Sequence, residues 1–97
     1  MNSLPADLIA WIERHFAPAD VPQAVSLLAG AVIHTGEPPG PRLLRCAAVG
    51  SQGKLERLQA CIHDLRIDWR DVIVGAEYEV RDGKLVHVRN LSNPMDA

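Results

Sequence analysis

Residues 51–67 read SQGKLERLQACIHDLRI, and the spacing of the apolar side chains in this stretch decides the fold class. These side chains recur at intervals of three or four residues, as they do on one face of an α-helix. They are Leu55, Leu58, Ile62 and Leu65. Charged and polar residues fill most of the positions between them, and Ser51 is a suitable N-cap. The stretch therefore predicts an amphipathic helix.

The residues that follow predict another helix and then a β-hairpin. Asp68 is in a position to be the N-cap of a further helix, and the apolar side chains after it repeat at helical period. These side chains are Trp69, Val72, Ile73 and Ala76. Two short apolar segments then flank an Asp82–Gly83 turn signal, which is typical of a hairpin.

The length of the hairpin loop decides which side chains share a face. A three-residue loop at 81–83, with Gly83 left-handed in a bulge, places four apolar or aromatic side chains together. They are Tyr78, Val80, Val86 and Val88. A two-residue loop would instead place the valines of the second strand beside charged residues. We therefore expect the three-residue loop, with His87 on the opposite face near Glu77 or Glu79.

The segment 42–49 fits either a helix or a strand. As a strand, each of its faces would mix arginine with apolar side chains, which is a poor pattern. As a helix, Arg42 and Arg45 share one side and the leucines and alanines form a stripe. Pro41 also suits a first helical turn. We favour the helix.

Two further helices are expected in the first 36 residues. The first runs from a cap at Ser3 to about His15, and the second runs from Asp20 to a stop at Gly36. Three prolines make residues 37–41 a stiff connector, and residues from about 92 to 97 resemble a flexible tail.

These elements predict a mostly α fold, a small helical domain with a short C-terminal β-hairpin. The alternative is an α+β fold with strands near 43–49, 72–80 and 85–89. A chain of 97 residues is long enough for one domain, and 47% hydrophobic residues supply its core.

The charge distribution does not favour nucleic-acid binding. The net charge is −2, although residues 41–70 carry six basic against three acidic side chains. The helix expected before the hairpin contains Asp71 and Glu77, which would repel phosphates. Nucleic-acid binding through the basic middle segment is therefore a minor hypothesis.

Six polar residues are candidates for a functional surface: Asp71, Glu77, Glu79, His87, Arg42 and Arg45. The acidic residues could form an acid–base pair or a cation site, although capping and solvation explain them as well. The arginines could belong to a basic patch or to an ordinary solvated helix face.

Cys46 and Cys61 are the two cysteines, and both lie in apolar-rich segments. We expect them to be reduced and buried. No paired spacing of Cys and His ligands predicts a metal, and no nucleotide-binding motif is present, so no cofactor is expected. A small Cys/His-dependent enzyme or metal protein remains an alternative, since a sequence does not show whether a thiol and a histidine meet in space.

Several segments between residues 42 and 94 resemble a family of small bacterial proteins of unknown function. The most distinctive is Trp69-Arg70-Asp71-Val72-Ile73, followed by Ala76-Glu77-Tyr78. The ending VRNLSNP at 88–94 fits the same resemblance. It implies a bacterial source and favours a helix through residues 69–76, and it assigns no activity.

The surplus of apolar stripes in so short a chain predicts a non-enzymatic protein–protein interaction module, with self-association as one form. No basic and apolar leader is found at the N-terminus, and the longest uncharged run is too short and polar to span a membrane. We therefore expect a cytoplasmic protein without membrane association.

Overall fold

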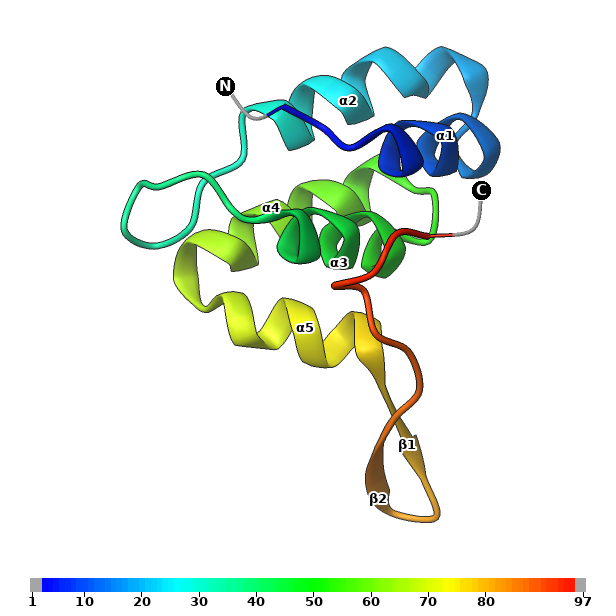
Figure 1. Cartoon of the computed structure of the whole chain (residues 1–97), viewed down its shortest axis with the longest axis vertical. Helices are drawn as coiled ribbons and strands as arrows, with labels where there is room; N and C mark the ends of the chain where they lie inside the picture. The colour runs from blue at the N-terminus through cyan, green and yellow to red at the C-terminus, as the bar shows by residue number, and fades with distance from the viewer. Residues whose placement is uncertain (1–2, 96–97) are drawn as a thin grey trace.

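Five α-helices and a C-terminal β-hairpin make up the computed structural model, which describes residues 3–95 (Figure 1). The helices are α1 (Ala6–His15), α2 (Val21–Ala29), α3 (Pro41–Ser51), α4 (Leu55–Ile67) and α5 (Trp69–Glu77), and a 3₁₀ turn, Pro18–Asp20, precedes α2. The strands are β1 (Tyr78–Arg81) and β2 (Lys84–His87). The predicted mostly α fold with a C-terminal hairpin is therefore confirmed.

The alternative α+β prediction is wrong, because α3 and α5 cover most of two of its three strands. In α3 the consecutive residues 44–48 are all buried. A strand would turn half of them toward each face, whereas the central helix of a bundle is covered on several sides.

α3 is that central helix, in contact with α1, α4 and α5 (Figure 1). Its small residues Cys46, Ala47 and Ala48 are fully buried, which lets the neighbouring helices approach closely. A β-carbon added at Gly50 would lie 3.3 Å from the sulfur of Cys61 on α4. Large apolar side chains complete the core, namely Leu8, Ile12, Leu28, Leu44, Leu58 and Leu65.

Several helix ends differ from the prediction. α1 begins after Pro5 without a side-chain cap, so Ser3 is not its cap. α2 ends at Ala29, seven residues before Gly36, which instead lies in a turn with φ of 84°. Ser51 belongs to α3, where its hydroxyl donates to the carbonyl of Ala48. The Asp68 cap is confirmed, since its carboxylate accepts a hydrogen bond from the Arg70 amide.

The turn between α3 and α4 packs tightly against the end of α1. Gln52 and Gly53 both have positive φ, 55° and 78°. A β-carbon at Gly53 would lie 2.2 Å from the carbonyl oxygen of His15, closer than non-bonded atoms approach. Glycine is therefore required here by both the backbone conformation and the contact.

The hairpin has a two-residue loop, so the predicted three-residue loop is wrong. Arg81 pairs with Lys84, and Asp82 and Gly83 both have positive φ, as in a type I′ turn. The prediction assumed that burial of one face would select the register. The hairpin instead extends from the helical body, and every residue of β2 is exposed (Figure 1). The register is then set by the type I′ turn, whose backbone twist matches the twist of the two strands.

The segment after the hairpin returns to the helical body, where Leu91 is buried. Of the predicted tail, residues 96 and 97 lie outside the described residues. Among the residues that are described, no helix has both the length and the apolar character that crossing a membrane requires.

Candidate functional site

The side chain of Glu77 lies at the junction of α5 and the hairpin and is completely buried. Arg42 on α3 donates to both of its carboxylate oxygens, with Nε–Oε2 and Nη2–Oε1 distances of 2.8 Å. His87 Nε2 lies 2.9 Å from Oε1. The thiol of Cys46 and the amide of Leu91 complete the set around Oε2, at 3.4 and 3.3 Å. We call these five residues the Glu77 cluster.

The hydrogen bonds from Arg42 lower the pKa of Glu77 to about 2, against the opposing effect of burial. Bonds from His87, Cys46 and Leu91 lower the pKa further. The carboxylate is thus ionised at neutral pH and can only accept hydrogen bonds, which makes Nε2 of His87 the donor. Five donors occupy the two oxygens, so this carboxylate is not available as a general base.

The two thiols are poorly suited to nucleophilic chemistry. Burial raises the pKa of Cys46 to about 12, and the hydrogen bond to Glu77 adds to this. Burial also raises the pKa of Cys61. Because the thiolate is the reactive species, both groups are weak nucleophiles near neutral pH. The contact between Cys46 and Glu77 is therefore structural.

A second ion pair holds the C-terminal segment against α1 and α3. Arg45 is buried and donates to both oxygens of Asp7, at 2.9 and 3.2 Å. The hydrogen bond from Arg45 lowers the pKa of Asp7. Arg45 also reaches the carbonyl of Leu91 at 3.3 Å, and the amide of Met95 donates to Asp7. Arg45 thus binds the chain that follows the hairpin directly, whereas Arg42 binds Glu77, whose carboxylate accepts from the amide of Leu91 in that chain.

Four of the six candidate residues lie in these two networks. Arg42, Glu77 and His87 meet directly, and Arg45 joins them through Leu91. The other two, Asp71 and Glu79, are exposed and lie apart from both networks. Sequence reasoning missed Asp7 as a partner of Arg45. Thirty-eight positions separate the two residues, and no local spacing relates them.

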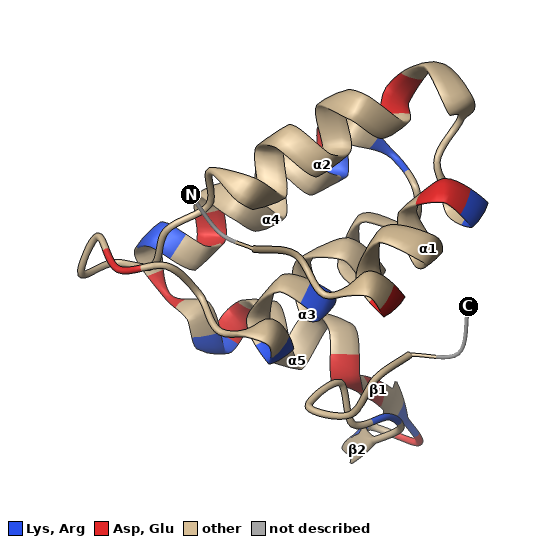
Figure 2. Ribbon diagram, turned by 45° about the horizontal axis from the view of Figure 1, so that its top comes forward, with Lys and Arg blue, Asp and Glu red and all other residues tan. Residues whose placement is uncertain are grey.

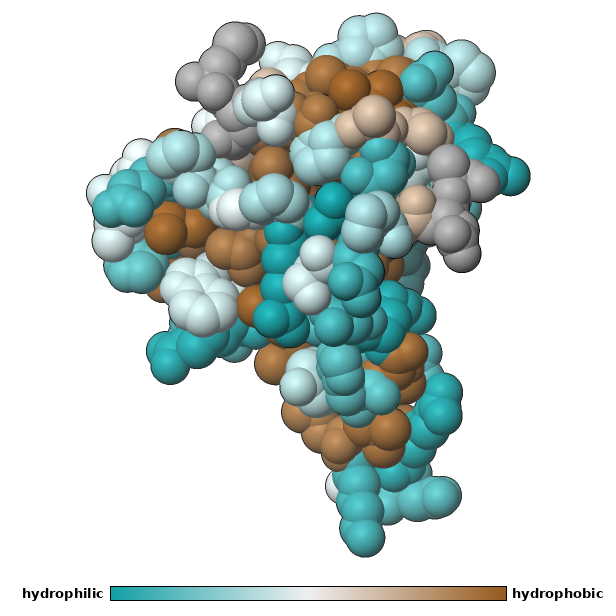
Figure 3. Space-filling view, in the orientation of Figure 1, coloured by the Kyte–Doolittle hydropathy of each residue, from teal (hydrophilic) through white to brown (hydrophobic). Residues whose placement is uncertain are grey.

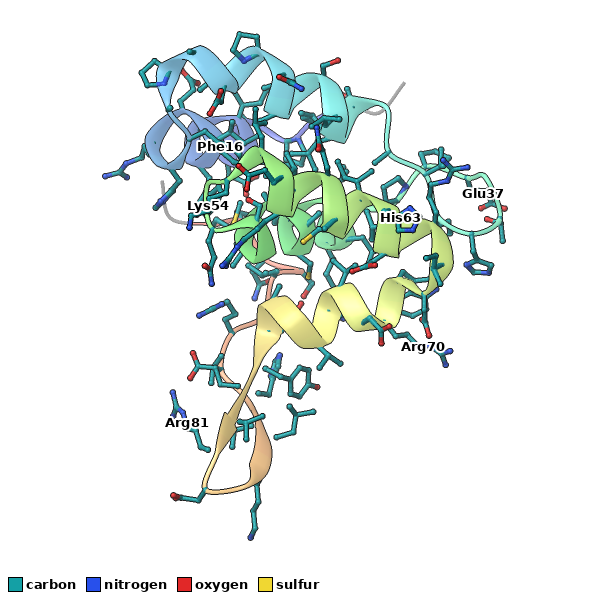
Figure 4. The ribbon with its side chains drawn as sticks, turned by 180° about the vertical axis from the view of Figure 1, so that it is seen from behind. Phe16, Glu37, Lys54, His63, Arg70 and Arg81 are labelled. Carbon is teal, nitrogen blue, oxygen red and sulfur yellow. The ribbon has the colours of Figure 1, made fainter. Side chains whose placement is uncertain are left out.

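The hairpin presents one apolar and one charged face. The cross-strand pairs Tyr78–His87 and Val80–Leu85 place these four side chains on one side, here called the apolar hairpin face. The pairs Glu79–Val86 and Arg81–Lys84 form the other side. Arg81 points away from the hairpin in Figure 4, and the brown surface in Figure 3 continues onto the hairpin.

The apolar hairpin face is largely open to solvent. Val80 is 73% exposed and Leu85 is 55% exposed. The rings of Tyr78 and His87 lie 4.7 Å apart near the base of the hairpin, where His87 also contacts Glu77. The face is therefore held at its base by the Glu77 cluster and is uncovered toward the tip.

Other surfaces offer less chemistry. An open hollow of about 390 Å³ lies beside the α4–α5 turn, lined by His34, Ile67, Asp68, Trp69 and Arg70. Its carboxylate and guanidinium pair with each other, at 3.0 Å. Within residues 3–95, no group of three His, Cys, Asp or Glu side chains is placed to hold a metal ion. Acidic and basic residues are interspersed along the helices and the hairpin (Figure 2).

Comparisons with protein-family models, with curated proteins and with solved structures find no match to this chain. The resemblance of residues 42–94 to small bacterial proteins therefore stays a prediction.

Proposed function

We propose that this chain is a non-enzymatic protein–protein interaction module that docks through its C-terminal hairpin. The observation that carries the proposal is the apolar hairpin face, which stands clear of the helical core with Val80 and Leu85 exposed. A two-stranded hairpin in water is marginally stable by itself, and added strands or a covering surface stabilise it. A partner would supply that cover.

The two alternative functions have weaker support. An enzyme that uses Cys46 with a histidine would need a thiolate, and the pKa of this thiol is about 12. A nucleic-acid binder would need a concentration of positive charge, whereas α5 and the hairpin carry both signs. Two free thiols fit a reducing compartment and support the proposal of a cytoplasmic protein, and the resemblance of residues 42–94 to small bacterial proteins supports a bacterial source.

The test compares the wild type with a V80S/L85S double variant and with the matched control V86S, which changes an exposed valine on the charged face. Self-association is measured by light scattering, and binding of a purified candidate partner by calorimetry. We expect V80S/L85S to abolish association while V86S retains it. Unchanged association in V80S/L85S would contradict the proposal. So would a wild type that neither self-associates nor binds a partner. Circular dichroism checks that the helical body is intact in each variant.

A further inference from the structure

The chemistry of the hairpin edges identifies a partner. We infer that the module, if the proposed function holds, docks onto a second copy of this chain by pairing the two β1 strands edge to edge. The result is a four-stranded antiparallel sheet with a twofold axis at Val80. This inference rests on the proposed function and names its partner and register.

The free edge of β1 presents the backbone groups of Val80 and the carbonyl of Tyr78, since the amide of Tyr78 donates to the carbonyl of Val74 at the end of α5. In a hairpin with a two-residue loop, the residues that flank the loop bond to each other, and such pairs alternate along the ladder. Arg81 and Glu79 therefore direct their N–H and C=O groups toward β2. Val80 lies between them and directs its groups outward, so two copies can exchange a pair of hydrogen bonds at this residue.

The charged side chains of β1 select a single register. With Val80 opposite Val80 of the second copy, Glu79 faces Arg81 of that copy and the reverse pair forms on the other side of the axis. A shift of two residues in either direction sets Glu79 against Glu79 or Arg81 against Arg81. A shift of one residue would place the apolar face of one copy beside the charged face of the other. Among these registers, the charges of β1 are therefore complementary only when Val80 lies opposite Val80.

The β2 edge offers no such match. Its charged residue is Lys84, and His87 can only add positive charge, so two β2 edges contain no pair of opposite charges. A lysine on an edge strand also discourages pairing. Charge complementarity therefore favours β1.

The predicted sheet is compatible with the shape of the molecule. The hairpin projects from the helical body (Figure 1). With Val80 opposite Val80, Tyr78 would lie opposite Asp82 of the second copy. The two bodies then lie at opposite ends of the sheet. Tyr78, Val80 and Leu85 from both copies share one face. Two four-residue edges bury less than the roughly 1,200 Å² typical of stable complexes, so we expect a weak, rapidly exchanging dimer.

Charge reversal on β1 tests the register. The variants are E79R, R81E and the double variant E79R/R81E, with K84E as a control on β2. Sedimentation is measured from about 10 μM to 1 mM, a range suited to an interface of this size. We expect each single variant to dimerise about tenfold more weakly than the wild type, because it replaces both attractive pairs with repulsive ones. The double variant and an equimolar mixture of E79R with R81E should recover wild-type affinity, and K84E should leave it unchanged.

Recovery in the mixture is the most specific outcome, since neither variant alone contains the complementary pair. If the wild type dimerises and the single variants do so equally well, this register is wrong. If the wild type is monomeric at 1 mM, the second-copy inference fails, whereas binding of another protein that V80S/L85S abolishes would still uphold the proposed function. Loss of both would contradict the two proposals together.

Discussion

Replacing Glu77 with glutamine should cost the fold about 3 kcal/mol at pH 7. The lowering of the Glu77 pKa from 4.5 to about 2 corresponds to roughly this free energy, at 1.4 kcal/mol for each pH unit. The amide has the same shape but can turn an oxygen toward one set of donors only. Its NH₂ group must then face either Arg42 and His87, or Arg42, Cys46 and the Leu91 amide. Each arrangement leaves buried donors unpaired.

The loss of unfolding free energy in E77Q should be largest at neutral pH and should decrease as the pH falls. A carboxyl whose pKa is lowered by folding contributes its full stabilisation above its unfolded pKa, here 4.5. This contribution falls as the pH drops from about 5 toward 2, where the folded carboxylate takes up a proton. Glutamine does not titrate. The difference between wild type and E77Q should therefore shrink steadily below pH 5, and the lowered pKa of Asp7, present in both proteins, should largely cancel from it.

Urea unfolding followed by circular dichroism at pH 7, 5, 4 and 3 measures this difference. E79Q is the matched control, because Glu79 is an exposed carboxylate two positions away, and its loss should change the free energy of unfolding by less than about 1 kcal/mol. The reasoning is refuted if E77Q matches the wild type at pH 7, or if the difference is as large at pH 3 as at pH 7.

Two further predictions concern packing and the thiols. G53A should lower the free energy of unfolding by about 3 kcal/mol or more, since its β-carbon would lie 2.2 Å from the His15 carbonyl, whereas G83A, with similar φ in open space, should cost about 1 kcal/mol. If G53A and G83A lost equal free energy of unfolding in thermal or urea experiments, the contact with the His15 carbonyl would add nothing to the cost. In the native protein at pH 8, Cys46 should react with Ellman's reagent far more slowly than the partly buried Cys61, because its pKa is about 12. C46A and C61A assign the two rates, and a fast reaction of Cys46 would contradict its burial.

The helices could be predicted because each buries a stripe whose period is visible locally. Leu58 and Leu65 are fully buried on α4, and Asp68 caps α5 as its position indicated. The hairpin register could not be obtained in the same way. Pattern reasoning selects a register by burying one face, and neither face of this hairpin packs on the core. The register follows instead from the Asp82–Gly83 turn, whose two residues adopt the positive φ values that a type I′ turn requires.

The polar networks were predictable only in part. The sequence predicts His87 near Glu77 or Glu79, on the hairpin face opposite Tyr78. His87 does contact Glu77, but the predicted face is wrong, because the two-residue loop pairs His87 with Tyr78 and puts both side chains on one face. The contact of Glu77 with Arg42 spans 35 positions and depends on how α3 packs against α5, which no local pattern specifies. Burial of Glu77 also ran against expectation, since a glutamate is rarely buried unless it is paired. The sequence thus indicated the right residue types without indicating their partners.

The Glu77 cluster and the exposed hairpin are parts of one arrangement. A hairpin that contributes little to the core needs another means of holding its direction relative to the helices, and here polar contacts provide it. The carbonyl of Glu77 accepts hydrogen bonds from the amides of Val88 and Arg89, while its carboxylate binds His87 and the amide of Leu91. Buried ion pairs add little net stability compared with apolar packing, but their geometry is specific. The contacts of Glu77 at the base of β1, together with Leu91 after β2, would fix the angle between the hairpin and the helical body. They would thereby fix the direction in which the free edge of β1 at Val80 faces. An E77Q variant that remains folded should therefore also dimerise less well, because a hairpin with a variable direction loses more entropy when it pairs.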